Sequence, residues 1–241
     1  MAGAWLREEQ ADLAIDKILA AASQAFVDLG VSRTGMGHIA QYAGCSRGTL
    51  YRYFKNRHEL HIAYINRAAH DLSNRLNAEL SAIPDPEQRL IEGIVRAVDE
   101  VRQTPGTAAW FAAGDSGIAA RMSRSSEVIE SAAESFVEQL LDPHGDDPSS
   151  LLRARWLVRV VVSLLTMPGE NEAEERALIA RFVTPALLDP GGDELLHRCV
   201  SGGERPSIAS IHAETRSTRG AGCGRAAANG ALRRDGPGAA T

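Results

Sequence analysis

The chain has 241 residues with a formal net charge of −5 at pH 7, and 44% of its residues are apolar. This size fits one extended domain or a small domain joined to a larger one. The longest apolar run, 157–167, contains Arg159 and is too short for a bilayer, and we identify no signal-type segment. We therefore expect a cytoplasmic protein without a membrane partner.

Positive charge is concentrated in one short part of the sequence. No acidic residue lies between Asp28 and Glu59, whereas that stretch holds five cations: Arg33, Arg47, Arg52, Lys55 and Arg57. Residues 1–60 hold 7 basic and 6 acidic residues, which leaves 19 basic and 25 acidic residues of the totals of 26 and 31 for the rest. The acid-free stretch predicts a polyanionic partner, which the average charge would hide.

Apolar residues near the start recur at steps of three and four, which predicts an amphipathic helix that ends at Gly30. Segment 34–57 then predicts two short helices joined by a tight turn and followed by the start of another helix. Apolar residues at 39, 40 and 43 form the inner face of the first, and Gly44 permits the left-handed backbone of the turn.

The second short helix has an inner and an outer face. Ser46 is a suitable N-cap, and Leu50 and Phe54, four residues apart, face the core beside Phe26. The outer face consists of Arg47, Gly48, Thr49, Tyr51 and Arg52. A helix of about two turns that presents cations and hydroxyl groups in this way suits the major groove of DNA.

Residues 30–60 resemble the DNA-binding domain of the TetR family of bacterial repressors. The matching residues are Thr34, Met36, Ile39-Ala40, Ala43-Gly44, Ser46, Gly48-Thr49-Leu50-Tyr51, Tyr53-Phe54 and Glu59-Leu60. The resemblance covers about the first quarter of the chain. It implies a helix-turn-helix domain followed by a variable ligand-binding and dimerisation domain of about six more helices.

The resemblance also implies that Thr49, Tyr51 and Tyr53 contact DNA, the tyrosines mainly through phosphates. It further implies that Gly48 lets the backbone approach the DNA closely. Lys55 and Arg57 begin the next helix, where free backbone N–H groups favour a phosphate. Arg47 and Arg52 are our candidates for base-edge contacts. The predicted DNA-binding residues are Thr34, Gly35, Arg47, Gly48, Thr49, Tyr51, Arg52, Tyr53, Lys55 and Arg57.

Three residues depart from the family pattern at the start of the first short helix. Gly35 stands where Thr or Ser is common, Gly37 adds a second glycine, and His38 replaces a usual Asp. Thr34 is expected to cap this helix. Because Gly35 has no hydroxyl, we expect it to reach a phosphate through backbone N–H groups.

The remaining chain is predicted to be helical as well, with helices over 59–80, 86–103, around 108–113, 118–141, 149–166 and 171–188. Nothing alternates like a strand, so the fold class is all-α with about nine helices. We expect a helix-turn-helix DNA-binding domain over 1–57 and a helical ligand-binding and dimerisation domain over 58–190. The Gly-, Ala-, Ser- and Arg-rich composition of 191–241 predicts a disordered tail.

The second domain is expected to form a dimer and to hold a ligand. The helix over 149–166 is apolar nearly all round, which predicts burial on both sides, and by resemblance the last two helices form a four-helix bundle with their twofold mates. The resemblance also implies a small-molecule pocket, for which the candidates are Tyr64, Trp110, Phe111, Met122, Phe136, Trp156 and Met167. Their apolar character favours an apolar or amphipathic effector.

We therefore expect a homodimeric repressor that a small molecule releases from a palindromic double-stranded operator. The alternative is an activator, or a non-specific architectural DNA-binding protein without a ligand. An enzyme is not expected, because GxGxxG and HExxH motifs are absent and no strand scaffold is predicted. Three further readings have less support: a metal at His58, His61 and His70, a redox switch at Cys45, and an acid group bound by Arg155, Arg159 or His61. We expect no metal and no cofactor.

Overall fold

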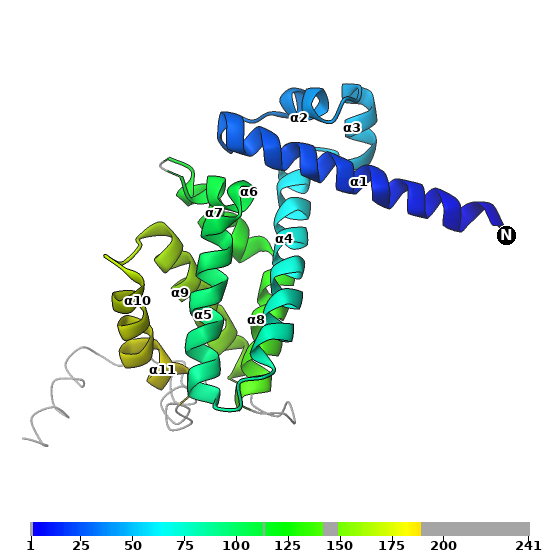
Figure 1. Ribbon diagram of the computed structural model, residues 1–241. Coiled ribbons are helices and arrows are strands. Elements are labelled where there is room, and N and C mark those ends of the chain that lie inside the picture. The colour runs from blue at the N-terminus through cyan, green and yellow to red at the C-terminus, as the bar shows by residue number, and fades with distance from the viewer. Residues whose placement is uncertain (1, 113, 142–148, 189–241) are drawn as a thin grey trace, which may run out of the picture. The chain divides into compact units, whose positions relative to one another are not determined.

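The computed structural model describes residues 2–112, 114–141 and 149–188, and in these residues every regular element is helical (Figure 1). The all-α prediction is confirmed. Residues 191–241, where a disordered tail was expected, lie outside the described part. None of the described helices is long and apolar enough to cross a membrane.

The head, residues 2–56, consists of α1 (Ala2–Leu29), α2 (Met36–Tyr42) and α3 (Arg47–Tyr53). Its core centres on Phe26, Ile39 and Leu50, all fully buried. Gly30 at φ +81° ends α1, and Gly44 at φ +64° makes the turn between α2 and α3, as only glycine readily does. In Figure 1 these three helices lie together at one end of the described chain.

The body, residues 57–188, begins with α4 (Arg57–Leu80), which runs away from the head (Figure 1). The Asn56 side chain caps it by accepting the Glu59 N–H at 2.9 Å. The first turns of α4 belong to the core of the head, because Leu60 and Tyr64 pack there. The division of the chain at residue 57 therefore stays a proposal.

Helices α5 to α11 complete the body around a second apolar core that includes Leu90, Ile94, Val137 and Ile179. They are α5 (Pro86–Gln103), α6 (Pro105–Ala108) with the 3₁₀ turn η1 (Ala109–Phe111), α7 (Ser116–Ser125), α8 (Glu127–Leu141), α9 (Ser150–Thr166), α10 (Glu172–Leu178), the π-helical turn η2 (Ile179–Val183) and α11 (Thr184–Leu188).

One prediction about these helices was wrong in detail. The expected helix over 118–141 is two helices, because Ser126 adopts an extended backbone and its Oγ accepts the Ile129 N–H at 3.1 Å, which starts α8. Helix α9 was expected to be buried on both sides; one chain covers only one side, and burial of the other by a twofold mate stays a prediction. One face packs into the second core, whereas Leu152 and Trp156 are exposed.

Candidate DNA-binding surface and ligand pocket

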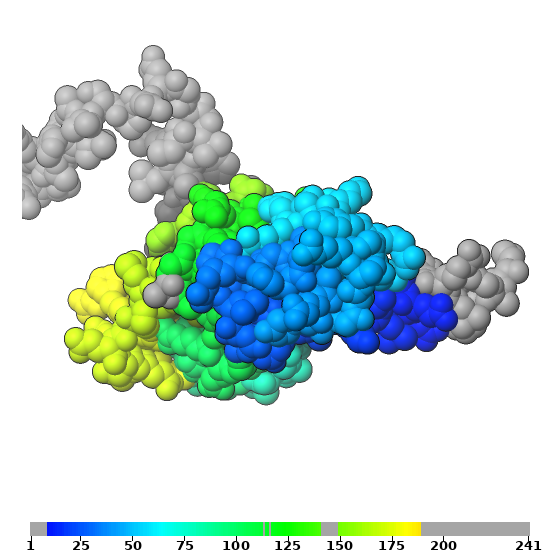
Figure 2. All heavy atoms as spheres, turned by 90° about the horizontal axis from the view of Figure 1, so that it is seen from above, coloured from blue at the N-terminus to red at the C-terminus, as the bar shows by residue number. Residues whose placement is uncertain are grey.

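The outer face of α3 presents the side chains expected to meet DNA. Ser46 Oγ accepts the Thr49 N–H at 3.0 Å and starts the helix. With Leu50 turned fully inward, Arg47, Gly48 and Arg52 are exposed and Tyr51 is 49% exposed. Figure 2 looks down on this end of the molecule, where α1, α2 and α3 form the surface in blue to cyan.

The cations on this surface are available to an anion. Arg47, Arg52 and Lys55 are exposed, and none of them forms an ion pair within the described residues. The Arg52 guanidinium lies 5.5 Å from the centre of the Tyr53 ring, which orients it beside a second predicted DNA contact. Unpaired cations beside hydroxyl groups provide the contacts that phosphates and base edges accept.

Thr34 does not belong to this surface, which corrects its predicted role. Its side chain is 0% exposed, and its hydroxyl donates to the carbonyl oxygens of Ala25 at 3.0 Å and Gly30 at 2.7 Å. The N-cap of α2 is Gly35 and not Thr34. Thr34 therefore holds the end of α1 and makes no side-chain contact with DNA in this conformation.

Arg57 is largely engaged inside the protein. Its Nη2 donates to the carbonyl oxygens of Val31 and, at 3.0 Å, Ser32, and its Nε donates to His61 Nε2 at 3.3 Å. These bonds tie the start of α4 to the turn between α1 and α2. Only Nη1 has no bond among the described residues, so a phosphate contact stays a prediction for that nitrogen alone.

The unusual start of α2 has a structural explanation that the sequence did not suggest. His38 Nδ1 accepts the Gly35 N–H at 3.3 Å, so it takes the place of the acidic side chain usual in a capping box. A Cβ at Gly37 would lie 2.8 Å from Arg47 Nη2, whereas one at Gly35 would meet no atom within 4 Å. The glycine at 37 therefore leaves room for the Arg47 guanidinium.

Asp115 links the body to the head, and sequence reasoning missed it. The side chain is buried just before α7, and it accepts the backbone N–H of Val31 at 2.9 Å and of Ser32 at 3.1 Å. These partners precede it by more than 80 residues, so no local pattern indicates the contact. Asp115 and Arg57 hold the same turn from two sides.

A cluster of aromatic rings joins α1, α4 and η1. The centre of the Phe26 ring lies 5.4 Å from that of His61, 5.2 Å from that of Tyr64 and 5.3 Å from that of Trp110. Burial, with smaller effects from the charges of Arg57 and His58, lowers the pKa of His61 to about 4. His61 is therefore neutral at physiological pH, which argues against its binding an acid group.

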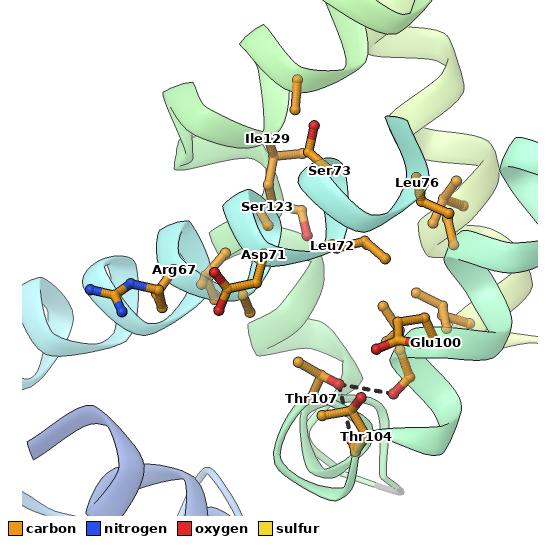
Figure 3. A pocket seen from close by; sticks show the side chains of 18 of the residues that line it. Arg67, Asp71, Leu72, Ser73, Leu76, Glu100, Thr104, Thr107, Ser123 and Ile129 are labelled. Carbon is orange, nitrogen blue, oxygen red and sulfur yellow. Dashed lines mark hydrogen bonds between the residues drawn. The ribbon is translucent and has the colours of Figure 1, made fainter. Parts of the chain in front are cut away.

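Beside this cluster lies a pocket of about 670 Å³, lined by parts of α1, α4, α5, α6, η1, α7, α8 and α9 (Figure 3). Four of the seven predicted residues line it, namely Tyr64, Trp110, Phe111 and Phe136. Among the described residues no group of three or more His, Cys, Asp and Glu is placed to hold a metal ion.

Three of the predicted lining residues were wrong. Met122 is buried in the core of the head, while Trp156 is 44% and Met167 70% exposed. For Trp156 the reason is the rotation of α9. The pocket is lined by Leu157, Val161 and Leu165 of this helix, which are spaced by four residues, so Trp156 points elsewhere. The apolar all-round sequence of α9 did not reveal which face would meet the pocket.

A helix-turn-helix head with free cations on its second short helix, joined to a helical body, is the architecture of a DNA-binding transcriptional regulator. Residues 18–64 match the family described as bacterial regulatory proteins, tetR family. An uncharacterized HTH-type transcriptional regulator of Mycobacterium tuberculosis (strain H37Rv) is 42% identical over 189 residues, which cover 78% of this chain and 92% of the relative. The chain therefore belongs to the TetR family of DNA-binding regulators, which are not enzymes.

Three further proteins resemble the chain, FasR over part of its sequence and AlkX and RolR in fold. The transcriptional activator FasR of Mycolicibacterium smegmatis is 38% identical over 74 residues, 31% of this chain and 34% of FasR. The crystal structure of the TetR family repressor AlkX from Dietzia sp. superposes with a TM-score of 0.55 at 21% identity, covering 71% of this chain and 96% of AlkX. The complex of RolR with resorcinol gives a TM-score of 0.59 at 16% identity, with 83% and 99% covered.

Proposed function

We propose that the protein is a homodimeric repressor that a small apolar or amphipathic molecule releases from a palindromic operator. The observation that carries this proposal is the pocket of about 670 Å³, because its lining includes Leu19 and Ser23 of α1 as well as residues of α4. A ligand there touches the first helix of the head and the helix that joins head to body. RolR, which shares the fold, binds resorcinol, so the fold can hold a small organic ligand.

The dimer is proposed to form through α9, α10 and α11. Leu152 and Trp156 of α9, Leu178 of α10 and Phe182 of η2 are large apolar side chains that are exposed in the single chain, Phe182 to 63%. A second copy packed on these elements would bury such side chains, as protein interaction sites do. Two copies of α3 would read two half-sites of a palindrome, whereas one short helix reads few base pairs.

For DNA contacts, we propose that Arg47 and Arg52 reach base edges and that Tyr51, Tyr53 and Lys55 bind phosphates. Thr49 and Gly48 lie on the same helix, and the open side of Gly35 supports an approach of phosphate to its backbone. An activator is the second candidate, because FasR, which is similar over 74 residues, is one. A repressor lowers transcription from the operator that it binds, whereas an activator raises it.

Selection of bound DNA from a random pool at physiological salt tests the proposal. We expect an enriched palindrome whose half-sites are about 34–36 Å apart. Arg52→Ala should weaken binding to it about tenfold or more, as loss of a base contact does, while the exposed Arg121→Ala of α7 should bind like the wild type. Recovery of random sequence without a motif would favour the architectural alternative, and transcription from the selected site separates repressor from activator.

A further inference from the structure

The pocket contains one pair of hydroxyl groups with unused hydrogen-bonding capacity. Ser23 of α1 and Tyr64 of α4 both line it, and their oxygens are 3.2 Å apart. Neither has another hydrogen-bond partner within the described part of the chain. Whichever hydroxyl donates, the hydrogen of the other stays free, so the pair can donate one more hydrogen bond.

An aromatic ring lies beside this pair. The Trp110 ring is stacked on Tyr64 with centroids 5.9 Å apart, and Trp110 lines the same pocket. Its indole nitrogen is buried and has no hydrogen-bond partner in the described residues. Because this nitrogen is not accessible from the pocket, the ring offers a ligand an apolar wall beside the hydroxyl pair and no donor.

Two other hydroxyls of the pocket are already engaged, whereas Ser73 and Thr104, which also line it, have no side-chain hydrogen bond in the described residues. Thr107 donates to the carbonyl oxygens of Val101 at 2.9 Å and Thr104 at 3.0 Å (Figure 3), and Ser123 donates to that of Ala119 at 3.0 Å. The donor near the aromatic cluster that a ligand can use therefore belongs to the pair of Ser23 and Tyr64.

The charged residues of the pocket do not offer a cation to a ligand. Arg67 pairs with Asp16 at 2.6 Å and Arg75 with Glu100 at 2.7 Å, and all four side chains are substantially exposed. In Figure 3 Arg67 extends away from the side chains around it. A carboxylate ligand would have to break one of these pairs or enter an apolar interior without a counter-charge, which is unfavourable.

We propose, on the basis of the ligand-released function above, that the pocket binds an uncharged, mostly apolar molecule with a hydrogen-bond-accepting oxygen, which the Ser23–Tyr64 pair receives. The α6 backbone closes the pair on its other side, since a Cβ at Gly106 would lie 1.9 Å from Ser23 Oγ and 2.4 Å from Tyr64 Oη. The ligand oxygen therefore approaches from the pocket, and its partner Ser23 belongs to the first helix of the head.

Displacement of a fluorescent probe tests this proposal on the full chain. N-phenyl-1-naphthylamine is apolar and has no oxygen, and 2-undecanone and undecanoate are competitors of equal length that differ in charge. In the wild type we expect the ketone to displace the probe at a concentration at least tenfold lower than undecanoate. In the double variant Ser23→Ala/Tyr64→Phe we expect unchanged probe affinity and about tenfold weaker displacement by the ketone, the usual effect of a lost hydrogen bond.

Ser123→Ala is the matched control, because its hydroxyl lines the same pocket but is bonded to its own helix; it should behave like the wild type. Two results would refute the proposed ligand class: equal displacement by ketone and carboxylate in the wild type, or unchanged ketone displacement in the double variant. Neither result would contradict the pocket as a binding site. If neither the probe nor the ketone binds the wild type, the pocket of the proposed function fails as well.

Discussion

Replacing Asp115 by alanine is expected to destabilise the protein by about 3 kcal/mol. The carboxylate accepts two backbone N–H groups, at 2.9 and 3.1 Å, and the alanine variant leaves both donors without a partner. A hydrogen bond to a charged group contributes about 1.5–3 kcal/mol, and the bond to Ser32 is nearer the lower value because it is only partly buried. Asp115→Asn should lose about half as much, since its side-chain oxygen can still accept one N–H.

Urea unfolding at fixed protein concentration measures this loss, and hydrogen exchange at Val31 and Ser32 localises it. The control is Asp71→Ala, an exposed carboxylate whose contact is His70 at 3.8 Å; its effect should stay within about 0.5 kcal/mol. A loss below about 1 kcal/mol for Asp115→Ala, or unchanged exchange at both amides, would refute the role of Asp115 in holding the turn.

Two further predictions concern pH and assembly. Because folding lowers the pKa of His61 from 6.5 to about 4, the unfolded chain takes up the proton first as the pH falls. The stability is complete above pH 6.5 and should decrease by up to about 2 kcal/mol between pH 6.5 and 5, a slope that urea unfolding of His61→Phe should lack. Phe182→Glu should give monomers in sedimentation, whereas Leu13→Glu, an equally exposed change on α1, should not; a dimeric Phe182→Glu would exclude this face.

The head was largely predictable from local sequence. The apolar spacing of Phe26, Leu50 and Phe54, the N-cap Ser46 and the turn at Gly44 all depend on contacts within a few residues, and the structure confirms them. The same local reasoning failed where two elements meet. The family pattern placed Thr34 on the DNA, but packing of the α1 end against the start of α2 buries it.

Local sequence was enough to predict the helical class, the helix-turn-helix and the cationic face of α3, because periodicity, capping and glycine conformations act over one or two turns. The tertiary structure alone decided what lines the pocket, because that depends on the rotation of α9 against helices far away in the chain. It also decided the bonds of Asp115 to the α1–α2 turn and of Tyr64 to Ser23, across 84 and 41 residues. Contacts over such separations leave no pattern in a single sequence, since they arise only when the helices pack.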